Sequence, residues 1–300
     1  MSATFDILGL GCIAVDDLLY VESYPPPDTK SPVRRRERRC GGQTGNALIA
    51  AARLGARCAY AGSLGPDPLS EYVRTSLQGE GIDCSWLRQI PEARPIHSTI
   101  IVEAQGGTRT VLYDLDGACP ASADWPDQRV IPFARVLYVD QFGIEGMLRA
   151  AKVAHDAAIP IVADFESDLW PGYHELVALV DHLILGEEFA LKLTQTSDPA
   201  SAVNALWTED RRAVIVTCGP AGCWYRDSSR SVPLHFPAFP VNTMDSTGCG
   251  DVFHGAYATA LAKGGEILER LRFASAAAAL KAAHGEMPRR AEVLALINRP

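Results

Sequence analysis

A carboxylate stands at the start of a predicted helix, directly after a glycine-rich turn. Gly248-Cys249-Gly250 precedes Asp251, and a helical pattern follows it. A helix that begins near Gly250 leaves the backbone N–H groups of residues 248–251 unpaired, and with the helix dipole they form an anion hole. Glycine permits the φ values and the close ligand approach that such a turn needs. The turn therefore predicts anion binding, and the negative side chain at its end needs a separate explanation.

Asp251 is suited to act as a base beside the bound anion. Phosphoryl transfer to an alcohol needs a base next to the attacking hydroxyl and N–H donors on the developing charge. We therefore predict Asp251 as the base, with Gly248, Cys249 and Gly250 as the anion hole. An ordinary capping role is the alternative for Asp251. Asp245, earlier in the same turn, either caps the turn or coordinates a cation.

Two further glycine-rich stretches border predicted helices or strands. Gly41-Gly42-Gln-Thr-Gly-Asn46 opens a helix, and Asn46 offers both a donor and an acceptor to a hydroxyl. Thr217-Cys-Gly219-Pro-Ala-Gly222 follows a buried strand, where α/β proteins bind nucleotides. Asp16, at the start of another strand, is a natural acceptor for sugar hydroxyls. The chain has no Walker A sequence, which argues against a P-loop NTPase.

One match to a dinucleotide-binding fingerprint lacks the context that the fingerprint needs. Gly9-Leu-Gly11-Cys-Ile-Ala14 follows a strand, but a Rossmann site requires a helix directly after the glycines. Residues 15–21 look extended and lead to three prolines. We therefore predict no dinucleotide site at this position.

The composition indicates a globular protein of the cytoplasm. The chain has 300 residues, of which 47% are apolar and 21% charged, and its net charge of −8 gives no basic field for nucleic acid. The eight cysteines are scattered singly, without a CxxC pair, which indicates reduced thiols. The N-terminus has no signal-peptide pattern, and no run of about 18 apolar residues predicts a membrane span.

Strand and helix patterns alternate along most of the chain. Strands are predicted at residues 5–11, 58–62, 136–140, 159–164, 182–186 and 213–217, and helices at 46–54, 69–80, 144–158 and 200–207. This alternation predicts an α/β fold with a doubly wound, mostly parallel sheet and helices on both faces. Two β-rich pieces, 12–40 and 96–118, break the alternation and predict a small attached sheet, with a hairpin turn at Gly106-Gly107. The core would then comprise residues 1–11, 41–95 and 119–300.

Together these motifs resemble the signatures of the ribokinase-like, or PfkB, family of carbohydrate kinases. Asp245-Ser-Thr-Gly-Cys-Gly-Asp251 is similar to the C-terminal signature D-T-x-G-A-G-D, and residues 41–55 match the N-terminal signature. Gly62-Ser-Leu-Gly-Pro-Asp67 matches the continuation G-x-x-G-x-D. The order and spacing hold over essentially the whole chain. The resemblance implies a ribokinase-like fold in which the small sheet is a lid.

The resemblance also implies the reactants and the residues that bind them. ATP would be the donor, Mg²⁺ the cofactor and a small sugar the acceptor, with Asp251 as the base. The sugar would be held by Asp16, Gly41, Gly42 and Asn46, and the nucleotide would lie along Thr217, Gly219, Gly222, Ala282 and Gly285. Asp245 and Thr247 would form the monovalent-cation loop, for K⁺, that some members have.

One family motif is missing from this chain. Members often carry N-x-x-E after a central strand, where it serves Mg²⁺ and phosphate handling. Here the equivalent stretch is Gly186-Glu187-Glu188-Phe189. Glu187 is the candidate substitute, acting through water, and the metal ligands stay open.

The acceptor is predicted from weaker similarities. Residues 251–257 and 271–281 are similar to the branch with sulfofructose kinases and ketohexokinases, which favours a hydroxymethyl group of a ketose or an acidic ketose derivative. Lys30, Arg109 and the run Arg34–Arg39 lie in the predicted lid and are candidates to meet an anionic group. Strand alternation would turn only every second arginine toward the site, and a solvated face is the alternative for the run.

Two other functions remain as alternatives. The chain could be a nucleoside kinase of the same superfamily, or a non-catalytic protein that binds a sugar or nucleotide. The family often dimerises through the lid, so a homodimer is a further expectation.

His254, on the helix after the base, is expected to be a packed or capping histidine.

Overall fold

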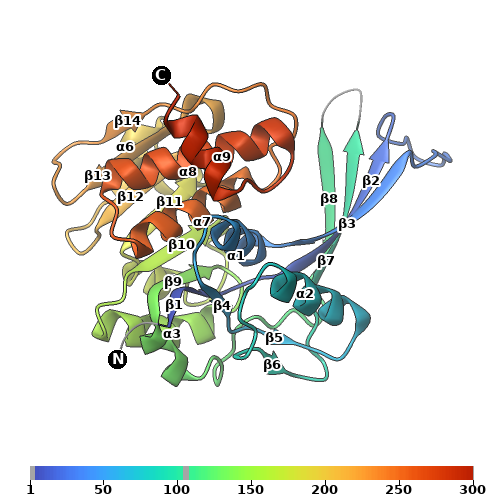
Figure 1. Ribbon diagram of the computed structural model, residues 1–300, viewed down its shortest axis with the longest axis horizontal. Helices are drawn as coiled ribbons and strands as arrows, with labels where there is room; N and C mark the ends of the chain where they lie inside the picture. The colour runs from blue at the N-terminus through green and yellow to red at the C-terminus, as the bar shows by residue number, and fades with distance from the viewer. Residues whose placement is uncertain (1–3, 104–107, 300) are drawn as a thin grey trace.

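The computed structural model describes residues 4–103 and 108–299, in which a large sheet carries helices on both faces (Figure 1). Its strand order is β14-β13-β12-β11-β10-β9-β1-β4. The strands are β1 (Phe5–Leu10), β4 (Cys58–Tyr60), β9 (Ala134–Asp140), β10 (Ile161–Phe165), β11 (His182–Gly186), β12 (Ala213–Thr217), β13 (Cys223–Asp227) and β14 (Leu234–Phe236). Neighbours from β4 to β12 pair in parallel, whereas β13 and β14 are antiparallel. The mostly parallel sheet that the alternation predicts is confirmed.

The helices form two layers because successive residues of a buried strand point to opposite faces. Along β1, Ile7 packs into one hydrophobic core and Leu8 into the other. The first core includes α1 (Gln43–Arg53), α2 (Pro68–Gly79), α7 (Cys249–Ala262), α8 (Ile267–His284) and α9 (Arg290–Ile297). The second includes α3 (Ile144–Asp156), α4 (Tyr173–Ala178), α5 (Glu187–Thr194), α6 (Pro199–Leu206) and the 3₁₀ turn η1 (Gln128–Phe133). This is the doubly wound arrangement.

The small sheet, called the lid below, projects from the core (Figure 1). Its strands are β3 (Arg35–Gly41), β2 (Ala14–Val21), β7 (Ile96–Glu103) and β8 (Arg109–Asp114), in this spatial order. Strand β2 follows β1 with no helix between them, so the extended chain that was predicted after Gly9–Ala14 is confirmed. Strands β7 and β8 pair antiparallel as predicted, but the turn at Gly106-Gly107 lies outside the described residues. A two-stranded sheet of β5 (Ser63–Leu64) and β6 (Arg88–Gln89) lies in the segment between the lid strands.

No helix in the described part of the chain is long and apolar enough to cross a membrane.

Candidate active site

Helices α1 and α7 bring together two predicted site residues that are 205 positions apart. The Nδ2 atom of Asn46 donates a hydrogen bond to Oδ2 of Asp251 at 2.7 Å. The helices can approach this closely because α7 has a glycine at the contact: a Cβ atom on Gly255 would lie 2.2 Å from the carbonyl oxygen of Ala47. The carboxylate of Asp251 is thereby held in one orientation beside the start of α7.

The start of α7 presents free N–H groups, as an anion hole requires. Gly248 caps the helix with φ of 72°, a left-handed conformation that favours glycine. Within residues 4–103 and 108–299, the N–H groups of Gly248, Gly250 and Asp251 have no hydrogen-bond acceptor. Cys249 is an exception to the prediction, because its N–H reaches the carbonyl of Ser246 at 3.3 Å. The long distance leaves that bond weak.

Burial and neighbouring carboxylates raise the proton affinity of Asp251. Burial raises the pKa of Asp251 well above its usual value, and the negative charge of Asp164 raises it further, against the opposing effect of the Asn46 hydrogen bond. Asp164, in β10, also has a raised pKa because of burial and the nearby charge of Glu166. A carboxylate with a raised pKa accepts a proton more readily at neutral pH. Neither Asp164 nor Glu166 was predicted as a site residue from the sequence, although Asp164 ends the predicted strand 159–164 and Glu166 lies two residues further on.

The cysteine of the turn adds no charge to the anion hole. Burial raises the pKa of the Cys249 thiol to about 11. Its Sγ atom lies 3.8 Å from the carbonyl oxygen of Asp245. The thiol therefore stays neutral at physiological pH and does not repel a phosphate.

His254 is a packed histidine, as expected. Its side chain is buried one turn after the anion hole, with Nδ1 2.8 Å from the carbonyl oxygen of Gly250 and Nε2 3.0 Å from that of Ile184. These contacts connect the first turn of α7 to the middle of β11.

Asp16 lies at the base of the lid, where Gly41 leaves space for its carboxylate. A Cβ atom on Gly41 would lie 2.0 Å from Oδ2 of Asp16. Burial raises the pKa of Asp16, while Ser98 and Arg39 act in the opposite direction. Gly42, with φ of 82°, caps α1 and so precedes Asn46 by one helical turn. The predicted sugar-binding residues thus come from adjoining ends of β2, β3 and α1.

The pairing of β2 with β3 determines which arginines of the lid face residues 245–250, called the anion-hole turn below. Asp16 is opposite Arg39 across β2 and β3, and Asp17 is opposite Arg38. Arg39 Nη1 lies 3.8 Å from Oδ2 of Asp245, whereas Arg38 binds Asp17 through two hydrogen bonds. The predicted alternation of the arginines is therefore confirmed.

The two other candidate cations of the lid differ in position. Arg109, in β8, reaches the turn with Nη1 3.4 Å from Oγ of Ser246. Lys30 is exposed in the connection between β2 and β3 and makes no such contact in the described part of the chain. Only Arg109 is placed to act together with Arg39.

The predicted nucleotide residues lie in two groups. Thr217 ends β12, and Gly219 and Gly222 belong to the turn around η2 (Gly219–Ala221), where a Cβ on Gly222 would lie 2.1 Å from the carbonyl oxygen of Phe236. Ala282 and Gly285 lie at the end of α8. The carbonyl of Ala282 accepts hydrogen bonds from the N–H groups of Met244 and Asp245, at 2.7 and 3.1 Å. The second group therefore supports the anion-hole turn directly.

Asp245 and Thr247 lie in one turn, and Lys281, which was not predicted as a site residue from the sequence, contacts Asp245. Oδ1 of Asp245 accepts from the Thr247 N–H at 2.9 Å, and Oδ2 lies 3.2 Å from Nζ of Lys281. Burial opposes ionisation of Asp245, but these partners outweigh it and lower its pKa. The available signal was a single charged residue within the alanine-rich run of α8.

In the part of the chain that the structure describes, side chains alone do not form a metal site. Across the described ranges, no group of three or more His, Cys, Asp or Glu residues is arranged to hold a metal ion. Glu187 is half-buried at the start of α5, directly after β11. It is one carboxylate at the edge of the sheet where the strands end, and Mg²⁺ commonly uses one or two carboxylates together with substrate phosphates.

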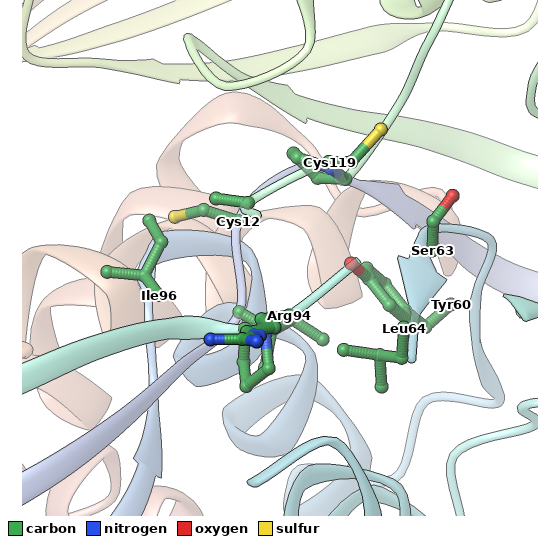
Figure 2. A pocket seen from close by; sticks show the side chains of 11 residues that line it. Cys12, Tyr60, Ser63, Leu64, Arg94, Ile96 and Cys119 are labelled. Atoms are coloured by element: carbon green, nitrogen blue, oxygen red, sulfur yellow. The ribbon is translucent and has the colours of Figure 1, made fainter. Parts of the chain in front are cut away.

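A small pocket lies at the base of the lid. Cys12, Tyr60, Ser63, Arg94 and Cys119 are among the residues that line it (Figure 2). Its volume is about 10 Å³, close to the least that holds one water molecule. The buried Oγ of Ser63 has no hydrogen-bond partner in the described structure, so a single water would suit it. The pocket is too small for a sugar.

Comparison with known proteins finds relatives over most of the chain. The profile described as "pfkB family carbohydrate kinase" matches residues 6–287. A ribokinase of Bacillus subtilis is 29% identical over 86% of this chain and 87% of its own. A ketohexokinase of Mus musculus is 23% identical over 89% of this chain and 92% of its own. The structure of a ribokinase of Arabidopsis thaliana with ribose and ATP superimposes with a TM-score of 0.85 at 22% identity, covering 100% of both chains.

Proposed function

The chain belongs to the PfkB family of carbohydrate kinases and is an ATP-dependent carbohydrate kinase; we propose that it phosphorylates a hydroxymethyl group of a ketose or ketose derivative, with Asp251 as the base. The contact between Asn46 and Asp251 beside the free N–H groups of α7 carries this proposal. It places a proton acceptor and an anion hole within one helical turn, as transfer to an alcohol requires.

In the proposed step, the acceptor oxygen attacks the γ-phosphorus of ATP. A new O–P bond forms, the bond from γ-phosphorus to the bridging oxygen of ADP breaks, and the hydroxyl proton moves to Asp251. The N–H groups of Gly248 and Gly250 stabilise the charge on the transferred group. Asn46 keeps the carboxylate of Asp251 oriented toward the hydroxyl.

ATP and Mg²⁺ fit the residues that are present. The free N–H groups at the start of α7 suit phosphate oxygens, and the end of α8 with the turn around η2 suits the rest of the nucleotide. Mg²⁺ bound to the phosphates would supply charge neutralisation, with Glu187 as a water-mediated contact. K⁺ was the expected occupant of the turn at Asp245 and Thr247.

The acceptor is proposed from two observations. The similarity to a ketohexokinase over most of both chains supports a ketose, and Arg39 and Arg109 beside the turn support an acidic derivative. Ribose is the second candidate, because of the similarity to ribokinases. Both classes carry a free hydroxymethyl group.

A panel of acceptors tests the proposal. Release of ADP from MgATP is measured with ketohexoses, their sulfonated and phosphorylated derivatives, ribose and nucleosides. We expect the highest kcat/KM with a ketose or its derivative. Turnover with ribose or with a nucleoside alone would contradict the proposed acceptor, and no turnover with any acceptor would favour a non-catalytic binding protein.

Replacing Asp16 by Asn should weaken acceptor binding. A hydrogen bond to a charged group contributes about 1.5–3 kcal/mol, so we expect the acceptor KM to rise by about 10- to 150-fold. The KM for ATP should change little, because Asp16 lies at the base of the lid. Steady-state kinetics with each substrate varied in turn measure both constants.

Asp17→Asn is the matched control for this experiment. The two carboxylates are neighbours on β2, but Asp17 faces the other side of the lid and binds Arg38 and His97. The acceptor KM of this control should stay near that of the wild type. Equal effects of the two substitutions would contradict the proposed role of Asp16.

The homodimer stays part of the proposal, with the lid as the contact. Leu112 and Tyr113 of β8 are exposed apolar side chains on the lid. Sedimentation equilibrium of the wild type and of Leu112→Glu tests it: a wild-type monomer at micromolar concentration would contradict the dimer.

A further inference from the structure

A buried lysine lies at the turn that leads into the anion hole. Lys281 is only 3% exposed, near the end of α8, and its Nζ atom lies 3.2 Å from Oδ2 of Asp245. Lysine is almost never buried without a charged partner. Its position therefore depends on the carboxylate of Asp245.

The ion pair is one of several contacts that join α8 to this turn. The N–H groups of Met244 and Asp245 both donate to the carbonyl of Ala282, the next residue after Lys281. The other carboxylate oxygen of Asp245 accepts from the Thr247 N–H at 2.9 Å. Gly248 follows directly and caps α7. The ammonium group of Lys281 is thus connected to the anion hole through its ion pair with Asp245.

A dissociable cation does not fit beside Asp245 in this arrangement. Both carboxylate oxygens already have donors, and one of the two donors carries a positive charge. Arg39 adds a second positive charge 3.8 Å from Oδ2. A K⁺ ion in contact with this carboxylate would be repelled by both cations, since like charges at such distances interact strongly in a partly buried site.

We propose that the ammonium group of Lys281 takes the place of a monovalent cation at this turn, so that the kinase reaction of this chain needs no added K⁺. Lys281 is a positioning residue: it holds Asp245, and through it the N–H groups of the anion hole, without touching substrate. The proposal rests on the proposed kinase function for its kinetic readout.

The cation dependence of the wild-type protein is the first test. The kcat and the KM for ATP are measured in KCl, NaCl and choline chloride at one ionic strength. We expect equal values in all three salts. Stimulation by K⁺ over choline of about fivefold or more, the lower end of typical coupling between two sites, would overturn the proposal.

Lys281→Met is the second test, because methionine keeps the length of the side chain and removes its charge. In choline chloride, loss of order in the turn should lower kcat/KM by about 10²-fold. K⁺ should then restore activity, and should raise the Tm of this variant more than choline does. A variant that is fully active in choline, or that K⁺ does not restore, would contradict the proposal.

Lys263→Met is the matched control. Lys263 donates from Nζ to the carbonyl oxygen of Gly55 at 3.1 Å, at the other end of α7, so its loss should create no dependence on K⁺. If Lys281→Met does not fold, the double variant Asp245→Asn with Lys281→Met removes both charges and should show no effect of K⁺ on Tm. A K⁺-dependent rise in that Tm would overturn the proposal.

The thermal measurement separates this proposal from the proposed function. If no acceptor is phosphorylated, the proposed function fails, but the Tm of the wild type and of Lys281→Met in KCl and choline chloride still shows whether Lys281 replaces the cation. If the enzyme is active and the wild type requires K⁺, only the proposal about Lys281 fails.

Discussion

Replacing Asp251 by Asn should lower kcat by about 10²–10⁴-fold, the usual contribution of a general base. Asn is nearly isosteric and can still accept the hydrogen bond from Asn46, so the geometry at the start of α7 is preserved. The dissociation constant of ATP should therefore stay close to that of the wild type. Steady-state kinetics and nucleotide titration measure the two quantities, and near-normal turnover would show that another group takes the proton.

The same substitution should raise stability at neutral pH. The folded-state pKa of Asp251 is raised by burial and by Asp164, so the folded protein holds a proton that the unfolded chain has released. The free energy of unfolding therefore falls as pH rises through the folded pKa, and the ionised carboxylate destabilises the protein above it. Asp251→Asn removes this effect. Thermal unfolding should give a Tm above that of the wild type at pH 8, with a smaller difference at pH 5.

The pH profile of kcat should reflect the raised pKa of Asp251. The base must be ionised, so kcat of the wild type should fall as pH falls through the raised pKa of Asp251. This acidic limb should lie well above the range of an ordinary Asp. A profile that stays flat down to the usual pKa of aspartate would contradict the assignment.

Replacing Gly255 by Ala should damage both stability and catalysis, although Gly255 touches no reactant. The new Cβ would lie 2.2 Å from the carbonyl oxygen of Ala47, a backbone atom that cannot rotate away. Helices α1 and α7 must then separate, which costs about 1–3 kcal/mol as overpacking. The separation also moves Asn46 away from Asp251, and a displacement of about 1 Å can lower the rate by about 10²-fold.

Gly79→Ala is the matched control for the helix contact. Gly79 also lies in a helix, but a Cβ there would meet no atom within 4 Å. Because Gly79 is the last residue of α2, alanine there should stabilise the control by less than the ~1 kcal/mol typical of a helix interior, without changing kcat. Urea unfolding and steady-state kinetics measure the free energy of unfolding and kcat of both variants. Equal values for the two variants would show that the contact between Gly255 and Ala47 relaxes at little cost.

Much of this protein was predictable from local sequence. The alternation of strand and helix patterns predicted the fold class and the small sheet. The glycines of residues 41–45 and 248–250 and the carboxylate of Asp251 predicted the kinase family through their resemblance to its signatures. Even the rejection of Gly9–Ala14 as a dinucleotide site followed from the extended residues after it. These features are local because backbone conformation and periodicity are set by nearby side chains.

Only the tertiary structure decided how charges are paired and buried. It placed Asn46 against Asp251, Asp164 near the same carboxylate, Arg39 rather than Arg38 beside the turn, and Lys281 on Asp245. The energy of a charge depends on its burial and on its partners, and in this protein those partners come from helices and strands far apart in the chain. The sequence therefore predicted which groups are candidates for the chemistry, whereas packing determined their ionisation and orientation.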